Sequence, residues 1–121
     1  MLIFAIDDEE LVLEGTEKVI KNAAPDAEVM TFIRTKAALE AIKEGKRPDI
    51  VFSDIEVPGI SGLEFAIKTK ELSPSTRIVF VTGYKEYAIE AFKIKAHGYL
   101  LKPVTEEDIR RELDYIPEVP L

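Results

Sequence analysis

The chain has 121 residues, enough to bury one hydrophobic core and too few for two domains of ordinary size. Hydrophobic residues make up 46% of it, charged residues 32%, and the mean hydropathy is close to zero, so neither a membrane nor disorder is needed to explain the composition. The absence of cysteine excludes disulfides, thiolate metal sites and cysteine nucleophiles, and a formal charge of −7 argues against direct binding of nucleic acid.

Short apolar runs alternate along the chain with stretches whose apolar residues recur at helical spacing. The runs have the length and composition of strands that are covered on both faces. In chain order we expect a strand at 2–6, a helix at about 9–24, a strand at 29–32, a helix that ends near 45, a strand at 50–53, a helix from 61 to about 73, a strand at 78–81, a helix at 85–95, a strand at 99–101, and a helix from 105.

The helical stretches also predict which side chains face the core. Capping patterns at Ser61-x-x-Glu64 and Thr105-x-x-Asp108 mark two helix starts. The expected inner residues, helix by helix, are Val12, Thr16, Val19, Ile20 and Ala23; Ala38, Leu39, Ala41 and Ile42; Ala88, Ile89, Ala91 and Phe92; and Ile109, Leu113 and Ile116.

Five strands alternating with five helices through short connections imply right-handed crossovers and a parallel sheet with helices on both faces. We therefore expect an α/β fold, a doubly wound five-stranded (βα)5 sheet, in one domain over residues 1–121. Its core is expected at about 2–116, with 117–121 as a terminal tail or the start of a linker. The longest apolar runs are about five residues against the roughly 20 of a membrane helix, so we expect a cytoplasmic protein without membrane association.

Polar residues that can carry chemistry follow four of the five strands. Asp7 and Asp8 follow the first, Asp54 the third, Thr82 the fourth and Lys102 the fifth. In such sheets ligands bind beyond the carboxyl ends of the strands, where the strand order reverses. If the order is 2-1-3-4-5, the three carboxylates meet in one crevice beside a hydroxyl and an ammonium group.

Three carboxylates in one crevice repel one another unless a cation neutralises them. Mg²⁺ suits such a site, because it takes one or two carboxylates, waters and substrate phosphate. Together with Lys102 it would bring the local charge close to zero. A phosphoryl group could then approach Asp54 for attack by the carboxylate, with the metal, Lys102 and Thr82 holding its oxygens.

Each of these residues also has a plain structural explanation. The acids at 7–10 can complement the positive end of the first helix, and Asp54 can be a turn or cap residue. Thr82 can be a helix cap and Lys102 a solvated lysine. Their convergence at four strand ends favours a shared site. His97, the only histidine, is expected to be a cap or a solvated side chain without a role in phosphotransfer.

Four motifs, in order along nearly the whole chain, resemble those of the receiver domains of response regulators in two-component signal transduction. They are IDDE at 6–9, SDIEVPGISG at 53–62, VTG at 81–83 and YLLKP at 99–103. The resemblance implies a flavodoxin-like fold similar to that of chemotaxis regulators. It also implies that Asp54 is the phosphoacceptor, that Asp8 binds Mg²⁺ directly and Asp7 through water, and that the backbone carbonyl of Glu56 is a further ligand.

The resemblance assigns roles to the last strand as well. Thr82 and Tyr99 would form the switch pair, in which the hydroxyl moves toward the phosphoryl group and the ring turns inward. Lys102 would pair with the phosphate, and the Lys102–Pro103 peptide bond is expected to be cis, a rare isomer. Glu56 and Tyr84 would tune the rate of phosphoryl hydrolysis.

The resemblance also implies partners. A histidine kinase would supply the phosphoryl group, and the switch would control transcription through an output domain outside this chain. An active homodimer would use the fourth helix, fifth strand and fifth helix, with charges among Lys93, Lys95, Arg110 and Arg111 paired with acids of a mate. The segments 86–92 and 99–103 look most like receivers that precede LytTR-type output domains, which often carry Asp where this chain has Gly98. Tyr84 and Tyr87 can contact a partner or pack on the surface.

Other function classes stay open from the sequence. A Mg²⁺-dependent phosphohydrolase similar to the haloacid dehalogenase group would explain Asp54 and Glu56, but the chain has no residues for a substrate cap. A receiver-like module that interacts without phosphate would be expected to lack the acids, Thr82 or Lys102. A flavin-binding protein is disfavoured, because the first loop is acidic where a flavin phosphate needs amides and hydroxyls. We expect a signalling phosphoacceptor and not an enzyme, apart from its own phosphorylation and dephosphorylation.

Overall fold

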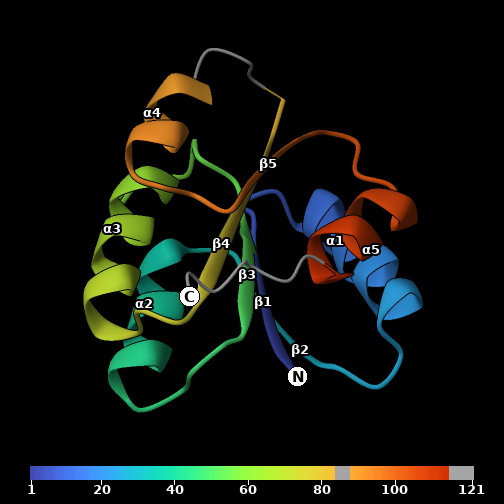
Figure 1. The fold of residues 1–121 in the computed structure, drawn as a ribbon, viewed down its shortest axis with the longest axis horizontal. Helices are drawn as coiled ribbons and strands as arrows, with labels where there is room; N and C mark the ends of the chain where they lie inside the picture. Colours follow the sequence, from blue (N-terminus) through green and yellow to red (C-terminus); the bar gives the residue numbers. More distant parts are fainter. Residues whose placement is uncertain (84–87, 115–121) are drawn as a thin grey trace, which may run out of the picture.

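The fold is a five-stranded parallel sheet between two layers of helices (Figure 1). The computed structural model describes residues 1–83 and 88–114. The strands lie in the order β2-β1-β3-β4-β5, which confirms the predicted doubly wound topology. In chain order the elements are β1 (Leu2–Ile6), α1 (Glu10–Ala23), β2 (Glu28–Phe32), α2 (Thr35–Lys43), β3 (Ile50–Ser53), α3 (Gly62–Leu72), β4 (Arg77–Thr82), α4 (Ala88–Lys93), β5 (Gly98–Leu101) and α5 (Glu106–Asp114).

Helices α2, α3 and α4 cover one face of the sheet, and α1 and α5 cover the other (Figure 1). The alternating side chains of the strands therefore divide the core into two clusters. Phe4, Val51 and Phe80 belong to the α2–α4 side, and Ile3 and Phe52 to the side of α1 and α5. Every residue of β3 is buried, as expected for the central strand of a sheet covered on both faces. No helix in the described part of the chain is long and apolar enough to cross a membrane.

Both predicted capping patterns are present. The Ser61 hydroxyl accepts a bond from the backbone N–H of Glu64 at 3.2 Å and starts α3. At the start of α5 the bonds are reciprocal, with the Asp108 N–H donating to the Thr105 hydroxyl at 3.1 Å and the Thr105 N–H to the Asp108 carboxylate at 3.0 Å. Each pair satisfies backbone groups that a helix end leaves without a partner.

The predicted inner faces need two corrections. Leu13 was not expected inside, yet it is buried with Ile20, while Val12 and Thr16 stay half-exposed. Phe92, predicted to face inward, is 83% exposed, because its neighbour Ala91 occupies the buried position and the next residue of a helix points about 100° away.

Several element boundaries also differ from the prediction, and some predicted positions are not described. Helix α4 ends at Lys93, two residues before the predicted 95, and its predicted start at 85 lies outside the described residues. The prediction that Ile116 faces the core, and those made for Tyr84, Tyr87 and the tail at 117–121, lie outside the described residues.

Candidate functional site

The site begins where β1 and β3 end side by side. These strands pair in parallel with Ile6 opposite Ser53, so the next residues, Asp7 and Asp54, are neighbours across the sheet edge. The Asp54 N–H donates to the Ile6 carbonyl at 3.0 Å and extends the pairing by one residue. Asp7 is 4% exposed and Asp54 6%, so two carboxylates are held almost out of water. Such groups need a compensating charge or hydrogen bonds.

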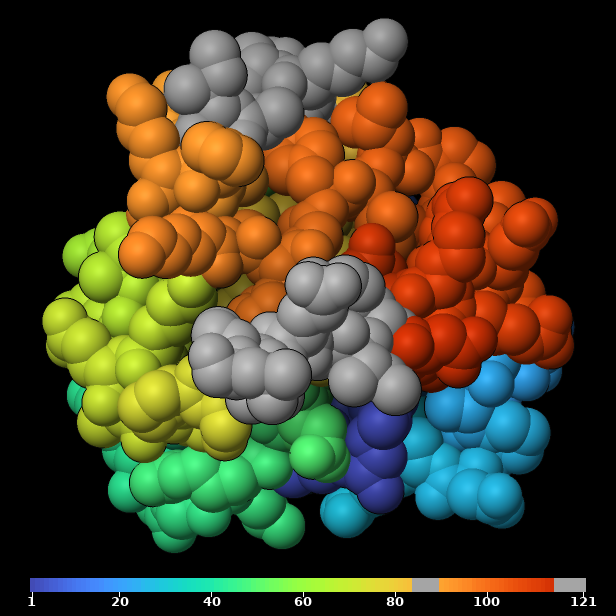
Figure 2. Space-filling model, viewed as in Figure 1, coloured from blue at the N-terminus to red at the C-terminus, as the bar shows by residue number. Residues whose placement is uncertain are grey.

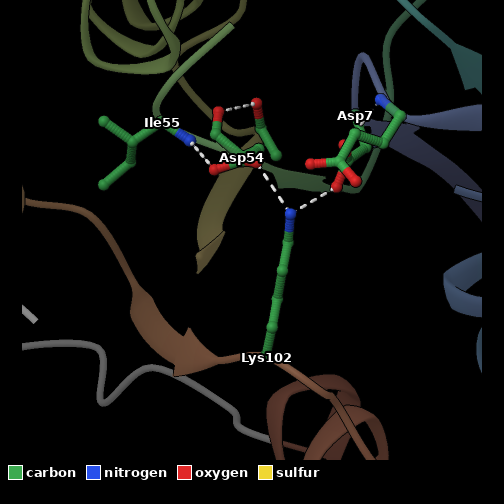
Figure 3. Close-up of polar contacts among 6 residues, drawn as sticks. Asp7, Asp54, Ile55 and Lys102 are labelled. Carbon is green, nitrogen blue, oxygen red and sulfur yellow. Dashed lines mark hydrogen bonds and ion pairs between the residues drawn. The ribbon is translucent and has the colours of Figure 1, made fainter. Parts of the chain in front are cut away.

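Lys102, just after β5, provides that charge (Figure 3). Its Nζ lies 2.6 Å from Asp7 Oδ2 and 2.8 Å from Asp54 Oδ2. Its backbone N–H donates to the Thr82 carbonyl at 2.9 Å, which fixes the strand end from which the side chain extends. Burial alone lowers the pKa of Lys102, but the hydrogen bonds and charges of Asp54 and Asp7 outweigh it, and the pKa is raised.

Backbone N–H groups orient both carboxylates. Asp54 Oδ1 accepts from the Ile55 N–H at 2.7 Å, and Asp7 Oδ1 accepts from the Glu9 N–H at 3.0 Å. In Asp54 one oxygen is therefore held by the backbone and the other faces the lysine (Figure 3). Asp7 is bonded in the same way, through Oδ1 to the backbone and through Oδ2 to the lysine. This arrangement leaves Oδ2 of Asp54 as the oxygen whose partner can move.

Asp8 completes the acidic group from an exposed position. One carboxylate oxygen from each of Asp7, Asp8 and Asp54 lies within 4.8 Å of the others. Two oxygens bound to one octahedral Mg²⁺ lie about 3.0 Å apart if adjacent and about 4.2 Å apart if opposite, from Mg–O bonds of about 2.1 Å. The three side chains therefore need only small movements to share one ion. A cavity of about 470 Å³ opens at this point, lined by Asp8, Glu9, Asp54, Glu56, Gly83 and Lys102.

The loop from β3 to α3 packs tightly against the phosphoacceptor candidate. An added Cβ at Gly62 would lie 2.1 Å from the Asp54 carbonyl oxygen and 2.8 Å from the Ile55 Cα, both backbone atoms. The Gly62 N–H donates to the Ile55 carbonyl at 2.8 Å and closes the loop on itself. Only glycine allows this close approach.

The structure brings together Asp7, Asp8, Asp54 and Lys102, all of which the sequence placed at strand ends. Thr82 is fully buried at the end of β4, and the Lys102–Pro103 bond is cis, as the resemblance implied. Tyr99 is half-buried and packs against the core cluster on the α2–α4 side.

Of the other residues singled out in the sequence, one lies apart from the site and one is outside the described residues. His97 lies before β5, at the opposite end of that strand from Lys102. It is exposed, which agrees with the expected solvated side chain, and its Nδ1 accepts a bond from the Ile78 N–H at 3.3 Å. Tyr84 is outside the described residues.

Sequence reasoning missed the residues that hold the acids in place. The Ile55 and Glu9 N–H groups act through backbone, so no side-chain pattern could reveal them. The close approach of Gly62 to the Asp54 carbonyl depends on the path of the folded loop, which the sequence does not show. Thr35 carried no sequence signal, although its hydroxyl donates to the Ile60 carbonyl in the same loop.

Comparisons with known proteins agree on one family. The family model for the response regulator receiver domain matches residues 3–114. The chain is 32% identical to the positive alginate biosynthesis regulatory protein of Pseudomonas aeruginosa and 38% identical to the transcriptional regulatory protein BtsR of Salmonella typhimurium, over 93% and 92% of the chain. It spans 46% of each of these relatives. A receiver domain structure from Clostridium thermocellum superposes with a TM-score of 0.84 at 28% identity, covering 93% of this chain and 90% of that one.

Proposed function

The chain belongs to the response regulator receiver domain family of two-component systems, and we propose that it is a Mg²⁺-dependent phosphoacceptor switch. In this proposal Asp54 accepts a phosphoryl group from a histidine kinase. The observation that carries it is the shared site of three carboxylates and one lysine, with two acids bonded to Lys102 Nζ and all three within reach of one ion. The proposed metal ligands are Asp7, Asp8, Asp54 and the backbone carbonyl of Glu56.

Asp54 Oδ2 is the proposed nucleophile. A P–O bond forms to Oδ2 while the bond between phosphorus and the donor's imidazole nitrogen breaks, and the imidazole takes a proton from water. The Ile55 N–H keeps Oδ1 in place during attack, because a backbone donor at 2.7 Å restricts rotation of the carboxylate. Bound Mg²⁺ would neutralise charge on the phosphoryl oxygens and on the acids.

Lys102 follows the transferred charge in this mechanism. Its ammonium group has three donors, so it can keep its bond to Asp7 and shift the other from Asp54 Oδ2 to a phosphoryl oxygen. Thr82, at the end of the neighbouring strand, would donate to a second phosphoryl oxygen. The backbone bond from the Lys102 N–H to the Thr82 carbonyl holds these two residues side by side on neighbouring strands. Tyr99, on the same strand as Lys102, would complete the switch by turning inward.

The surface formed by α4, β5 and α5 is the proposed output face. Figure 2 shows these elements on one continuous side of the molecule. Phe92 of α4 is 83% exposed and Leu101 of β5 is 42% exposed, so two apolar side chains lie open on this side. Exposed apolar groups favour a contact that buries them, and a second copy of the chain offers the same pair.

The switch is proposed to control transcription through an output domain beyond this chain. The relatives named above are regulators by name and are about twice as long as the matched part. We place the protein in the cytoplasm, where a histidine kinase would reach it. Its chemistry would be limited to its own phosphorylation and dephosphorylation. Glu56, which lines the cavity, and Tyr84 would tune hydrolysis, and replacing both with alanine should then change the acyl-phosphate lifetime.

Intact-mass spectrometry after incubation with Mg²⁺ and acetyl phosphate tests this proposal. The parent should gain about 80 Da, the mass of one phosphoryl group, only when Mg²⁺ is present. Asp54→Asn should gain no mass. Asp26→Asn removes an exposed acid from the connection between α1 and β2, outside the site, and should behave as the parent. No gain in the parent would favour a phosphate-independent interaction module. Sustained turnover of a phosphate ester would favour the phosphohydrolase.

A further inference from the structure

We propose that Thr35 is a positioning residue of the metal site. Its buried hydroxyl fixes the β3–α3 loop, and through that loop the Glu56 carbonyl, relative to the acidic cluster. The inference rests on the proposed Mg²⁺ site and adds to it a residue that does not touch the ion.

The contact joins the first residue of α2 to a loop that is distant in sequence. Thr35, the first residue of α2, is fully buried, and its hydroxyl donates to the carbonyl of Ile60, 25 residues further along the chain. Ile60 lies in the loop between β3 and α3, four residues after Glu56. A buried hydroxyl without a partner is costly, so the bond from Thr35 favours one position of the loop.

Threonine at the start of a helix usually bonds to its own backbone. Here the N-cap residue is Arg34, which makes no side-chain cap bond, and the Thr35 hydroxyl reaches out to another element instead. Local helix capping therefore does not account for the position of this side chain. Its bond is a tertiary one, between α2 and the loop that follows the phosphoacceptor.

The two joined loops meet beside the acidic cluster. A cavity of about 200 Å³ is lined by Asp8, by Ile33 and Arg34 of the β2–α2 loop, and by Pro58 of the β3–α3 loop. A change in the separation of the loops therefore changes the wall next to Asp8. Thr35 follows Arg34, one of the lining residues, directly in the chain.

Two backbone bonds hold the base of the β3–α3 loop. The Val57 and Gly62 N–H groups both donate to the Ile55 carbonyl, at 3.2 and 2.8 Å, and fix the two ends of the loop to one point. Gly59 between them has a positive φ of 81°, a conformation suited to a tight turn. A loop closed at its base can still tilt, and the bond from Thr35 to Ile60 opposes that tilt.

Binding of Mn²⁺ as a probe ion, followed by the loss of the free-ion electron paramagnetic resonance signal, tests the inference. Thr35→Val and Thr35→Ala should bind Mn²⁺ several-fold more weakly, less than the roughly 10-fold loss for a residue bonded directly to a ligand, because Thr35 acts on Glu56 through the loop. Thr35→Ser keeps the hydroxyl and should stay within about two-fold of the parent. Circular dichroism verifies folding, and if the valine variant does not fold, the alanine and serine variants decide the comparison.

Thr76→Val is the matched control for lost stability alone. Thr76 is also buried, and its hydroxyl donates to the Pro48 carbonyl at 2.7 Å before β4, at the end of the sheet away from the site. The Thr76→Val variant should have a lower melting temperature than the parent and the same Mn²⁺ affinity. Equal weakening by Thr76→Val, or unchanged affinity in Thr35→Val and Thr35→Ala, would overturn the inference. Failure of the parent itself to bind Mn²⁺ would instead overturn the proposed metal site.

Discussion

Replacing Lys102 with methionine tests the charge balance of the site in the absence of metal. In the parent the ammonium group lies 2.6 and 2.8 Å from two carboxylates that are almost completely buried. The variant keeps a side chain of similar length but leaves Asp7 and Asp54 facing each other without a cation. Loss of one partner of a buried ion pair costs about 3–5 kcal/mol. The lysine side chain is 22% exposed, so water screens part of the effect, and we expect about 2–3 kcal/mol.

Urea unfolding followed by circular dichroism measures this loss, since the chain has no tryptophan. In thermal unfolding at about pH 7 without Mg²⁺, the melting temperature of the variant should lie about 10 °C below that of the parent. Lys18→Met removes the same charge from an exposed position on α1 and should have little effect. Added Mg²⁺ should stabilise Lys102→Met more than the parent, because the ion then compensates acids that no lysine neutralises.

The pH dependence gives an independent check. The pKa of Lys102 is raised in the folded chain above its ordinary value of 10.5, so its contribution is fully present below about pH 10.5. It is lost as the pH rises through the folded value, and the gap between parent and variant should close there. Equal stability of Lys102→Met and Lys18→Met at neutral pH would show that Lys102 does not neutralise the acids, and the reasoning would fail.

Three further predictions concern the scaffold. Gly62→Ala should destabilise the fold by about 2–4 kcal/mol in urea unfolding, because the new Cβ meets backbone atoms. Gly15→Ala, in the middle of α1 with no atom within 4 Å of the added Cβ, should stabilise the fold by about 0.5–1 kcal/mol. A similar effect of both substitutions would contradict the packing argument. Thr69→Val should raise stability by about 1 kcal/mol, since the buried Thr69 hydroxyl has no hydrogen-bond partner among the described residues, and a loss of stability would refute this. The pKa of His97 is lowered from 6.5, first by burial and then by two nearby cations. The unfolded chain therefore takes up the proton more readily, and stability should fall as the pH drops below about 6.5. His97→Gln should reduce that fall in acid unfolding curves.

The helices and strands were predictable because the spacing of apolar residues and the capping and turn residues mark them in the sequence. The five strands, their order and the capped starts of α3 and α5 were all predicted. The errors fall where tertiary packing decides. Phe92 is exposed although it is apolar, because Ala91 takes the buried position and the next residue of a helix points about 100° away. Hydrophobic pattern alone cannot choose between two adjacent apolar residues.

The acids and the lysine of the site were predictable because parallel strands carry their last residues to one edge. Asp7, Asp54 and Lys102 follow three different strands, and the register of β1 with β3 sets their separation. The supporting contacts were not predictable. The bond from the Ile55 N–H to Asp54 involves backbone, and the bond from Thr35 to Ile60 joins loops 25 residues apart. Neither leaves a pattern in residue type or spacing.

Gly98 shows why a departure from the family pattern need not disturb the site. An added Cβ there would lie 2.6 Å from a carboxylate oxygen of Glu112, so the space beside Gly98 is filled by an acid from α5. Burial raises the pKa of Glu112, and the charge of Arg77, which donates to the Glu112 carbonyl at 2.9 Å, acts in the opposite direction. The Glu112 carboxylate thus occupies the space that a side chain at position 98 would need. Gly98 still pairs with Val79, so β5 keeps its register on β4 and carries Lys102 to the acids at its other end.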